Sequence, residues 1–271
     1  MRLSITSDEL SLDLNSALEI LSDQQCREFE IHSLGLDTVP NVDERWIVQA
    51  EKAVQKRLRV TSLAPHFFFD GIPTESESNA LFALAKRLKC NLISIFGTKN
   101  ADLGHIDDHE KIILPSDETL AAMRRFISQA ASECCEVAVR QYPETFAGTA
   151  AESLELIQAI GADRKQFGLD WDVAQCFAAG DDSGLDSLQN VLPHLKAVRV
   201  RDAIRRGTGA EWVSLGKGVI PWEDILEQLY DGGYRGPVIL EPGVAPKMKE
   251  GRAALSLAAR WIGACRVKSA D

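Results

Sequence analysis

Charged side chains end several apolar runs in the second half of the chain. Asp172 and Glu241 each directly follow such a run, and Arg199 and Arg201 alternate with valine. Carboxylates can ligate a cation or move a proton, whereas guanidinium groups are permanent donors that bind anions. A charged residue at the end of an apolar strand is expected where parallel strands deliver side chains to the C-terminal mouth of a (β/α)8 barrel. We therefore expect the site at that mouth.

The elements that must position these residues alternate along the chain. Short apolar segments predict eight strands, at residues 3–6, 29–32, 59–64, 91–96, 136–140, 166–171, 198–200 and 238–240. Segments with helical periodicity separate them, at residues 14–21, 46–58, 76–89, 118–134, 149–160, 185–192, 221–230 and 251–265. These spacings suit parallel βαβ crossovers rather than hairpins. The sequence therefore predicts a single (β/α)8 TIM barrel, with one domain over residues 1–271.

Composition restricts the partners and the compartment. The net charge of −10 argues against a nucleic-acid surface, and no apolar run approaches the roughly 20 residues that cross a bilayer. Residues 1–14 lack the basic and apolar segments of a signal peptide. The six cysteines are scattered without a CxxC pair, which favours reduced core residues. We expect a cytoplasmic protein that binds neither membrane nor nucleic acid; a homo-oligomer is left open.

Two stretches carry a resemblance to a known family. Residues 213–222 read Val-Ser-Leu-Gly-Lys-Gly-Val-Ile-Pro-Trp, and residues 233–241 read Gly-Tyr-Arg-Gly-Pro-Val-Ile-Leu-Glu. They resemble the xylose isomerase-like TIM-barrel family of sugar phosphate isomerases and epimerases, where the region reads Leu-Gly-Glu-Gly, a Trp, then Gly-Tyr-x-Gly and a strand ending in Glu. The family also includes the endonuclease IV type of DNA-repair enzyme. A weaker match extends over the whole chain.

The resemblance implies a divalent metal held by a Glu, an Asp, a His and a Glu at the ends of strands five to eight. Asp172 and Glu241 match the Asp and the last Glu. However, Arg140 occupies the place of the strand-five Glu, and Arg199 that of the strand-seven His. A guanidinium group offers only donors and cannot ligate a cation. The sequence therefore predicts that the usual metal is absent, with no other cofactor.

Two arginines beside two carboxylates suggest a replacement for the metal. Unpaired carboxylates in a partly closed mouth cost several kcal/mol per ion to desolvate. Arg140 and Arg199 would supply roughly the charge of a divalent cation, in a fixed network with Asp172 and Glu241. Whether these two arginines also bind a ligand or are only structural is left open.

Further positions shift the predicted pocket from acidic to basic. Gln175 stands where the family has a His, and Lys217 where it has a Glu between two glycines. His66 lies at the end of the third predicted strand. Ligand-binding roles are predicted for these three residues and for Arg140, Arg199 and Arg201. Such a pocket favours a sugar, a sugar phosphate or a sugar acid.

The leading functional hypothesis is a family member that acts on or binds a small, anionic carbohydrate without the divalent metal. If the protein is active, Glu241 or Asp172 would move a proton next to a carbonyl while the arginines stabilise the enediolate oxygen. An adjacent arginine weakens a carboxylate as a base, so a role as ion-pair partner competes. The alternative function is an inactive barrel that binds a metabolite or a protein. Endonuclease activity is disfavoured because it would require more metal ligands and a basic surface.

Two loops leave further alternatives. The loop after the fourth predicted strand is interpreted as solvated rather than as a metal cluster, and it contains Asp102, His105, Asp107, Asp108 and His109. Residues 67–69 are three consecutive phenylalanines, which would cover the mouth as a lid or contact another subunit.

Overall fold

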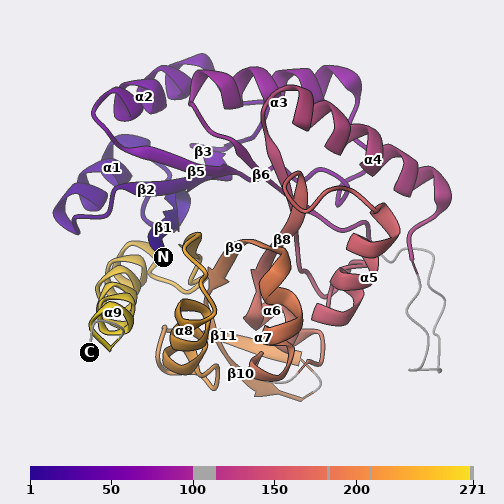
Figure 1. The fold of residues 1–271 in the computed structure, drawn as a ribbon. Helices are drawn as coiled ribbons and strands as arrows, with labels where there is room; N and C mark the ends of the chain where they lie inside the picture. Colours follow the sequence, from indigo (N-terminus) through magenta and orange to yellow (C-terminus); the bar gives the residue numbers. More distant parts are fainter. Residues whose placement is uncertain (100–113, 182–183, 208, 269–271) are drawn as a thin grey trace.

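The computed structural model describes residues 1–99, 114–181, 184–207 and 209–268, and its centre is a closed barrel of parallel strands (Figure 1). Around the barrel the strands follow the order β1, β12, β9, β8, β7, β6, β5, β2. Their bounds are β1 (Arg2–Thr6), β2 (Glu28–Ile31), β5 (Arg59–Leu63), β6 (Leu92–Phe96), β7 (Glu136–Arg140), β8 (Phe167–Asp172), β9 (Leu195–Val200) and β12 (Pro237–Leu240). The predicted single (β/α)8 barrel is confirmed; the domain limits of 1–271 stay a prediction.

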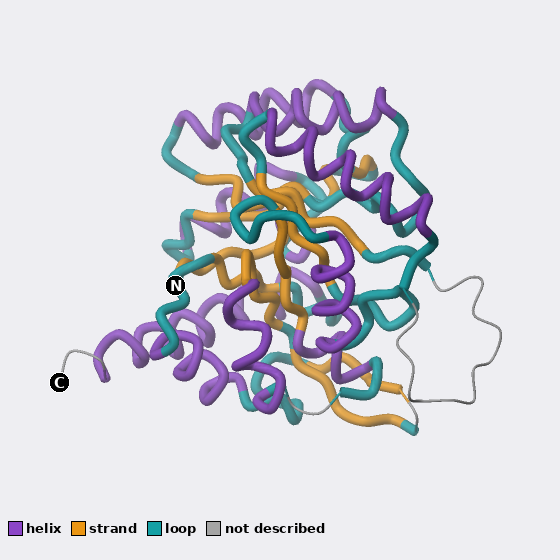
Figure 2. Tube along the Cα trace, turned by 45° about the vertical axis from the view of Figure 1, so that its right-hand side comes forward, coloured by secondary structure: helices purple, strands orange, loops and turns teal. Residues whose placement is uncertain are grey.

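Helices surround the strands (Figure 2). Their bounds are α1 (Leu14–Asp23), α2 (Glu44–Gln55), α3 (Glu75–Arg87), α4 (Asp117–Ser132), α5 (Ala150–Ile160), α6 (Val173–Ala178), α7 (Leu185–Val191), α8 (Trp222–Asp231) and α9 (Lys247–Lys268), with 3-10 turns η1 (Ser7–Glu9) and η2 (Leu192–His194). Thr149 and Glu152 form the predicted capping box of α5, and Gly161 ends that helix with a φ of 68°. None of the described helices is long and apolar enough to cross a membrane.

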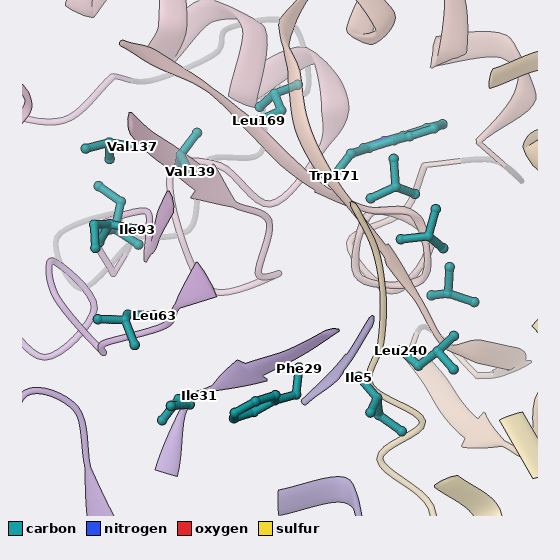
Figure 3. Close-up of a cluster of buried hydrophobic side chains, with 14 of the residues drawn as sticks. Ile5, Phe29, Ile31, Leu63, Ile93, Val137, Val139, Leu169, Trp171 and Leu240 are labelled. Carbon is teal, nitrogen blue, oxygen red and sulfur yellow. The ribbon is translucent and has the colours of Figure 1, made fainter. Parts of the chain in front are cut away.

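Alternation along the strands separates an apolar outer face from a polar lumen. Apolar strand residues such as Ile5, Phe29 and Trp171 join the core cluster that includes the helices (Figure 3). The buried residues between them point to the other side of the sheet. They are mostly polar, and include Ser4, Thr6, Glu30, Ser62, Ser94, Arg140, Asp170, Asp172 and Arg199. Nearer the strand starts, a separate apolar cluster fills the lumen with Leu92, Ala138, Ala197 and Ile239. The polar groups are thereby left at the C-terminal end of the barrel.

Some local expectations were wrong. Two antiparallel hairpins interrupt the parallel crossovers, β3 (Ser33–Leu34) with β4 (Asp37–Thr38) and β10 (Asp202–Arg206) with β11 (Gly209–Val213). Their strands follow β2 and β9 almost without a break, so the pattern does not separate them from the barrel strands. Cys134 is exposed, whereas the other cysteines are buried as predicted.

Asp202 anchors the loop that follows the β10–β11 hairpin. Its Oδ2 accepts hydrogen bonds from the backbone N–H groups of Gly216 at 2.9 Å and Gly218 at 3.0 Å, and its Oδ1 accepts one from Ile220 at 3.3 Å. A Cβ atom at Gly218 would lie 2.0 Å from that Oδ1 and 2.5 Å from the carbonyl oxygen of Ala203. The close approach of this loop to the carboxylate therefore requires glycine.

Gly218→Ala is expected to lower the free energy of unfolding by about 1–3 kcal/mol, because the added methyl group must displace a buried carboxylate or the backbone. Urea denaturation measures the change. Gly209→Ala is the matched control, since the nearest atom to its added Cβ, the carbonyl oxygen of Arg206, lies 3.9 Å away. Equal stability of the two variants would contradict the packing described here.

Candidate functional site

Seven ionisable side chains meet at the C-terminal end of the barrel. They come from five of its strands or from the residues directly after them. They are the arginines Arg140, Arg199 and Arg201 and the carboxylates Glu30, Asp170, Asp172 and Glu241. The four positions that the sequence aligns with the family's metal ligands therefore do converge. The network is larger than predicted, because Glu30 on β2 and Asp170 on β8 also take part.

Arg199 is the deepest member of this network and is fully buried. Its Nη1 and Nη2 lie 2.6 and 2.8 Å from the two carboxylate oxygens of Glu30, and Nη1 also lies 2.6 Å from Glu241 Oε2. Its Nε donates to Asp170 Oδ2 at 3.2 Å. Burial alone would raise the pKa of Glu30, but the Arg199 guanidinium outweighs burial and holds this pKa below its usual range. Every nitrogen of the guanidinium group has a carboxylate partner.

Hydroxyl groups complete the deep part of the network. Thr6 and Ser62 donate to the two oxygens of Glu30, at 3.0 and 2.6 Å, and Ser94 donates to Asp170. All three come from other barrel strands at inward-facing positions. Buried charges are stable only when paired and hydrogen bonded, and this layer meets that requirement except at Asp170 Oδ1, which is buried without a hydrogen-bond partner among the described residues.

Arg140 and Arg201 form the upper layer, together with Glu241 and Asp172. The Nη2 atoms of both arginines lie close to Glu241 Oε1, at 2.6 Å for Arg140 and 2.7 Å for Arg201. Burial raises the pKa of Glu241, but Arg140, Arg201 and Arg199 together hold it well below its usual range. Asp172 Oδ2 lies 3.1 Å from Arg201 Nη2. For this aspartate burial dominates, and its pKa is raised. The two carboxylates therefore differ in proton affinity.

A pocket of about 370 Å³ opens above this upper layer. Its lining consists of His32, His66, Phe96, Arg140, Tyr142, Pro143, Glu144, Gln175, Ala178, Arg201, Trp212 and Glu241. The guanidinium carbon of Arg140 lies 5.1 Å from the ring centre of Phe96, and that of Arg201 lies 5.3 Å from that of Trp212. The Nη1 groups of both arginines make no hydrogen bond within the described part of the chain. The pocket thus offers donors between aromatic walls.

The structure brings only some of the predicted ligand-binding residues to this pocket. His66 and Gln175 line it together with the two upper arginines. Arg199 and Asp172 are fully buried beneath the pocket, and neither side chain is part of its lining. Lys217 is exposed on the loop after the β10–β11 hairpin and does not line the pocket. The roles assigned to these residues stay predictions.

Sequence reasoning missed His32, which also lines the pocket. His32 directly follows β2, and His66 comes three residues after the end of β5. Its position at a strand end could therefore have identified His32 as a candidate pocket residue. His32 Nδ1 lies 2.9 Å from the carbonyl oxygen of Ala64, and its ring centre lies 4.7 Å from that of His66. His66 Nδ1 lies 3.2 Å from Asp70 Oδ2. Burial, followed by His32, lowers the pKa of His66.

The two loop alternatives have different outcomes. Asp102, His105, Asp107, Asp108 and His109 lie outside the described residues. Among the residues that the structure describes, no group of three or more His, Cys, Asp or Glu side chains is placed to hold a metal ion. Phe67 and Phe68 are buried against Phe126 of α4 rather than forming a lid, and Phe69 packs against Phe96 and Tyr142 beside the pocket.

Comparison with known families decides what kind of barrel this is. The family model described as "Xylose isomerase-like TIM barrel" matches residues 21–265. The chain belongs to the xylose isomerase-like TIM barrel family. The resemblance stated from the sequence is thereby confirmed. A search of curated proteins gave no match.

Solved structures share the fold of this xylose isomerase-like barrel at low sequence identity. The probable 3-DHS dehydratase AsbF from Bacillus anthracis, involved in petrobactin synthesis, is 15% identical with a TM-score of 0.75, over 96% of this chain and 99% of that chain. The IOLI protein with a bound zinc atom is 17% identical with a TM-score of 0.73, over 99% of both chains. D-Psicose 3-epimerase from Clostridium cellulolyticum, determined with D-tagatose, is 17% identical with a TM-score of 0.73, over 97% and 99%. At these identities the likeness shows the fold alone.

Proposed function

We propose that this barrel binds a small anionic carbohydrate, a sugar acid or a sugar phosphate, in the pocket at its C-terminal mouth. The observation that carries the proposal is that Arg140 and Arg201 both line the pocket, and that the Nη1 group of neither makes a hydrogen bond in the described part of the chain. A guanidinium group matches the geometry of carboxylate and phosphate oxygens. A cavity of about 370 Å³ with aromatic walls has the character of a small-molecule site. The epimerase determined with D-tagatose supports a carbohydrate as the ligand class.

The proposed site works without the divalent metal, because its residues do not fit one. Both oxygens of Glu241 are held by guanidinium nitrogens at 2.6 or 2.7 Å. Arg140 and Arg199 offer only donors at two of the four family ligand positions. A divalent cation would have to displace these guanidinium nitrogens from the carboxylate oxygens that it needs as ligands. The zinc of the IOLI protein therefore has no counterpart in the proposed site.

The ion pairs favour binding over proton transfer by the two carboxylates. Glu241 faces the pocket, but the three arginines that lower its pKa also make it a weak base near neutral pH. Asp172 has a raised pKa but lies beneath the pocket lining. The geometry thus supports a metabolite-binding barrel more directly than a metal-free isomerase that uses these carboxylates. No feature of the described residues favours a protein partner.

Calorimetric titration with D-gluconate tests this function. Arg140→Met and Arg201→Met are each expected to weaken binding about 10-fold to 100-fold, since each removes a charge-assisted hydrogen bond worth about 1.5–3 kcal/mol. Arg206→Met is the control, because Arg206 pairs with Glu211 on the exposed hairpin, away from the pocket lining. Circular dichroism would verify that all three variants fold.

Protein purified without chelator can be used to test whether the site binds a divalent metal. We expect no stoichiometric metal by mass spectrometry and no saturable binding of manganese. Binding of one divalent ion per chain would contradict the metal-free site. Unchanged gluconate affinity in both pocket variants would instead exclude the arginines as the ligand-binding groups.

A further inference from the structure

The charges at the mouth do not favour an anion by themselves. The network contains three guanidinium groups and four carboxylates, so its formal charge is −1 when all are ionised. An anionic ligand would add further negative charge to a site that is largely withdrawn from solvent. Neutralising that charge requires a positive group that is not yet committed to the network. A proton taken up with the ligand is the simplest source, and imidazole is the side chain that takes one up near neutral pH.

His32 offers a nitrogen suited to this uptake. Its Nδ1 lies 2.9 Å from the carbonyl oxygen of Ala64, and a carbonyl only accepts hydrogen bonds. Nδ1 therefore carries the proton, and Nε2 of the neutral ring has a free lone pair. Nε2 has no hydrogen-bond partner within the described part of the chain, and His32 lines the same pocket as the two arginines. The backbone thus fixes one nitrogen so that the other remains available to a ligand.

The surroundings of His66 disfavour it as the ring that receives the proton. Burial, His32 and Arg140 act together to lower the pKa of His66, against a smaller opposing effect of the exposed Asp70. Asp8 of η1 is a further charged neighbour of His32; burial raises the pKa of Asp8, and His32 and Lys247 of α9 act to lower it. Since the ring centres are only 4.7 Å apart, a charge on one ring disfavours a charge on the other. The two imidazole rings therefore favour one bound proton over two.

We infer that an anion binding to Arg140 and Arg201 is taken up together with one proton, and that Nε2 of His32 receives it. The inference rests on the proposed function, because it needs the anion site. It adds a ligand-facing residue and a pH dependence to that site. The new Nε2–H group then donates to the bound anion from the side of the pocket formed by β2, while the arginines donate from the sides formed by β7 and β9.

The test uses D-gluconate, whose carboxylate has a pKa near the usual 3.3–3.7 of an α-carboxyl group and so keeps a fixed charge from pH 6 to pH 8. Gluconate should bind more tightly at pH 6 than at pH 8, by at most about tenfold per pH unit, because one proton is taken up with each ligand. Calorimetry in buffers of different ionisation enthalpy should show net proton uptake. His32→Gln should abolish both effects. His194→Gln, on η2 and outside the pocket lining, should preserve them.

Different failures have different meanings. A pH dependence that survives in His32→Gln, or that only His66→Gln removes, would overturn the assignment to His32 while leaving the anion site intact. Absence of gluconate binding at pH 6 would overturn the proposed function and this inference with it. Nitrogen-15 NMR of the imidazole groups gives a check that needs no ligand, because His32 must show a protonated Nδ1 and an unprotonated Nε2 at pH 8. The opposite tautomer would also overturn the inference.

Discussion

Arg199→Met is expected to lower the free energy of unfolding by about 3–5 kcal/mol at pH 7, the usual cost of removing one partner from a buried ion pair. The methionine would fill much of the same volume but leave Glu30 and Asp170 facing each other across the lumen. Neither carboxylate is exposed to solvent, so neither can be rehydrated without opening the barrel. Protonation would relieve the repulsion, and the defect should therefore shrink as the pH is lowered toward 5.

Urea denaturation at pH 7 and pH 5 measures this effect. Arg87→Met is the matched control, because Arg87 also pairs with two carboxylates, Glu44 and Glu51, but at the surface, where such pairs contribute about 0–1 kcal/mol. Adding Glu30→Gln and Asp170→Asn to Arg199→Met should recover part of the loss, since the uncompensated charges are then removed. A loss no larger than that of the surface control would refute the structural role of Arg199.

Glu241→Gln is expected to tighten gluconate binding about tenfold or more, the reverse of the effect usual for a residue at a binding site. The Glu241 carboxylate is an internal anion that occupies Arg140 and Arg201 in the free protein. A neutral amide competes less well for the guanidinium groups, and releasing one charge-assisted hydrogen bond is worth about 1.5–3 kcal/mol. The affinity gain should accompany a loss of stability, because three arginines lose their shared counter-charge.

Calorimetry and acid denaturation together test this prediction. The folded-state pKa of Glu241 is depressed, so its stabilisation is fully present above the usual carboxyl value near 4.3 and disappears as the pH falls through the depressed value. Glu241→Gln should therefore flatten the acid side of the stability curve below about pH 4. Glu211→Gln, on the exposed hairpin, is the control and should change neither property. Loss of gluconate binding in Glu241→Gln would show that the carboxylate positions the arginines rather than competing with the ligand.

The fold could be predicted from the sequence because each barrel strand is short, apolar and followed by a helical segment. The positions of Arg140 and Arg199 could be predicted from the sequence, because a motif at the strand end fixes which side chains point into the barrel. Glu30 was missed although it is flanked by Phe29 and Ile31, a pattern that indicates an inward-facing position. A single sequence does not show which inward-facing charges meet across the lumen, since that depends on how the strands are staggered around the barrel.

Other differences come from the loops. The β10–β11 hairpin sets the course of the chain between β9 and α8, and Lys217 is exposed beyond it although its place in the motif suggested a pocket residue. Trp212, on the same hairpin, lines the pocket instead. Loop geometry depends on contacts such as those of Asp202 with the backbone of Gly216 and Gly218, which link residues 14 and 16 positions apart. Periodicity carries no information about such contacts.

The Arg199 network also has a consequence for how the barrel assembles. Its partners lie on β2, on β8 and directly after β12, and the pair with Glu30 spans 169 positions of the chain. The first four strands folded alone would hold Glu30 without its counter-charge, whereas the last four would keep Arg199 paired with Asp170 and Glu241. The N-terminal half therefore cannot exclude water around Glu30 at low cost before the C-terminal half supplies Arg199. The lumen charges therefore act against an N-terminal half-barrel intermediate and make closure of the ring a cooperative event.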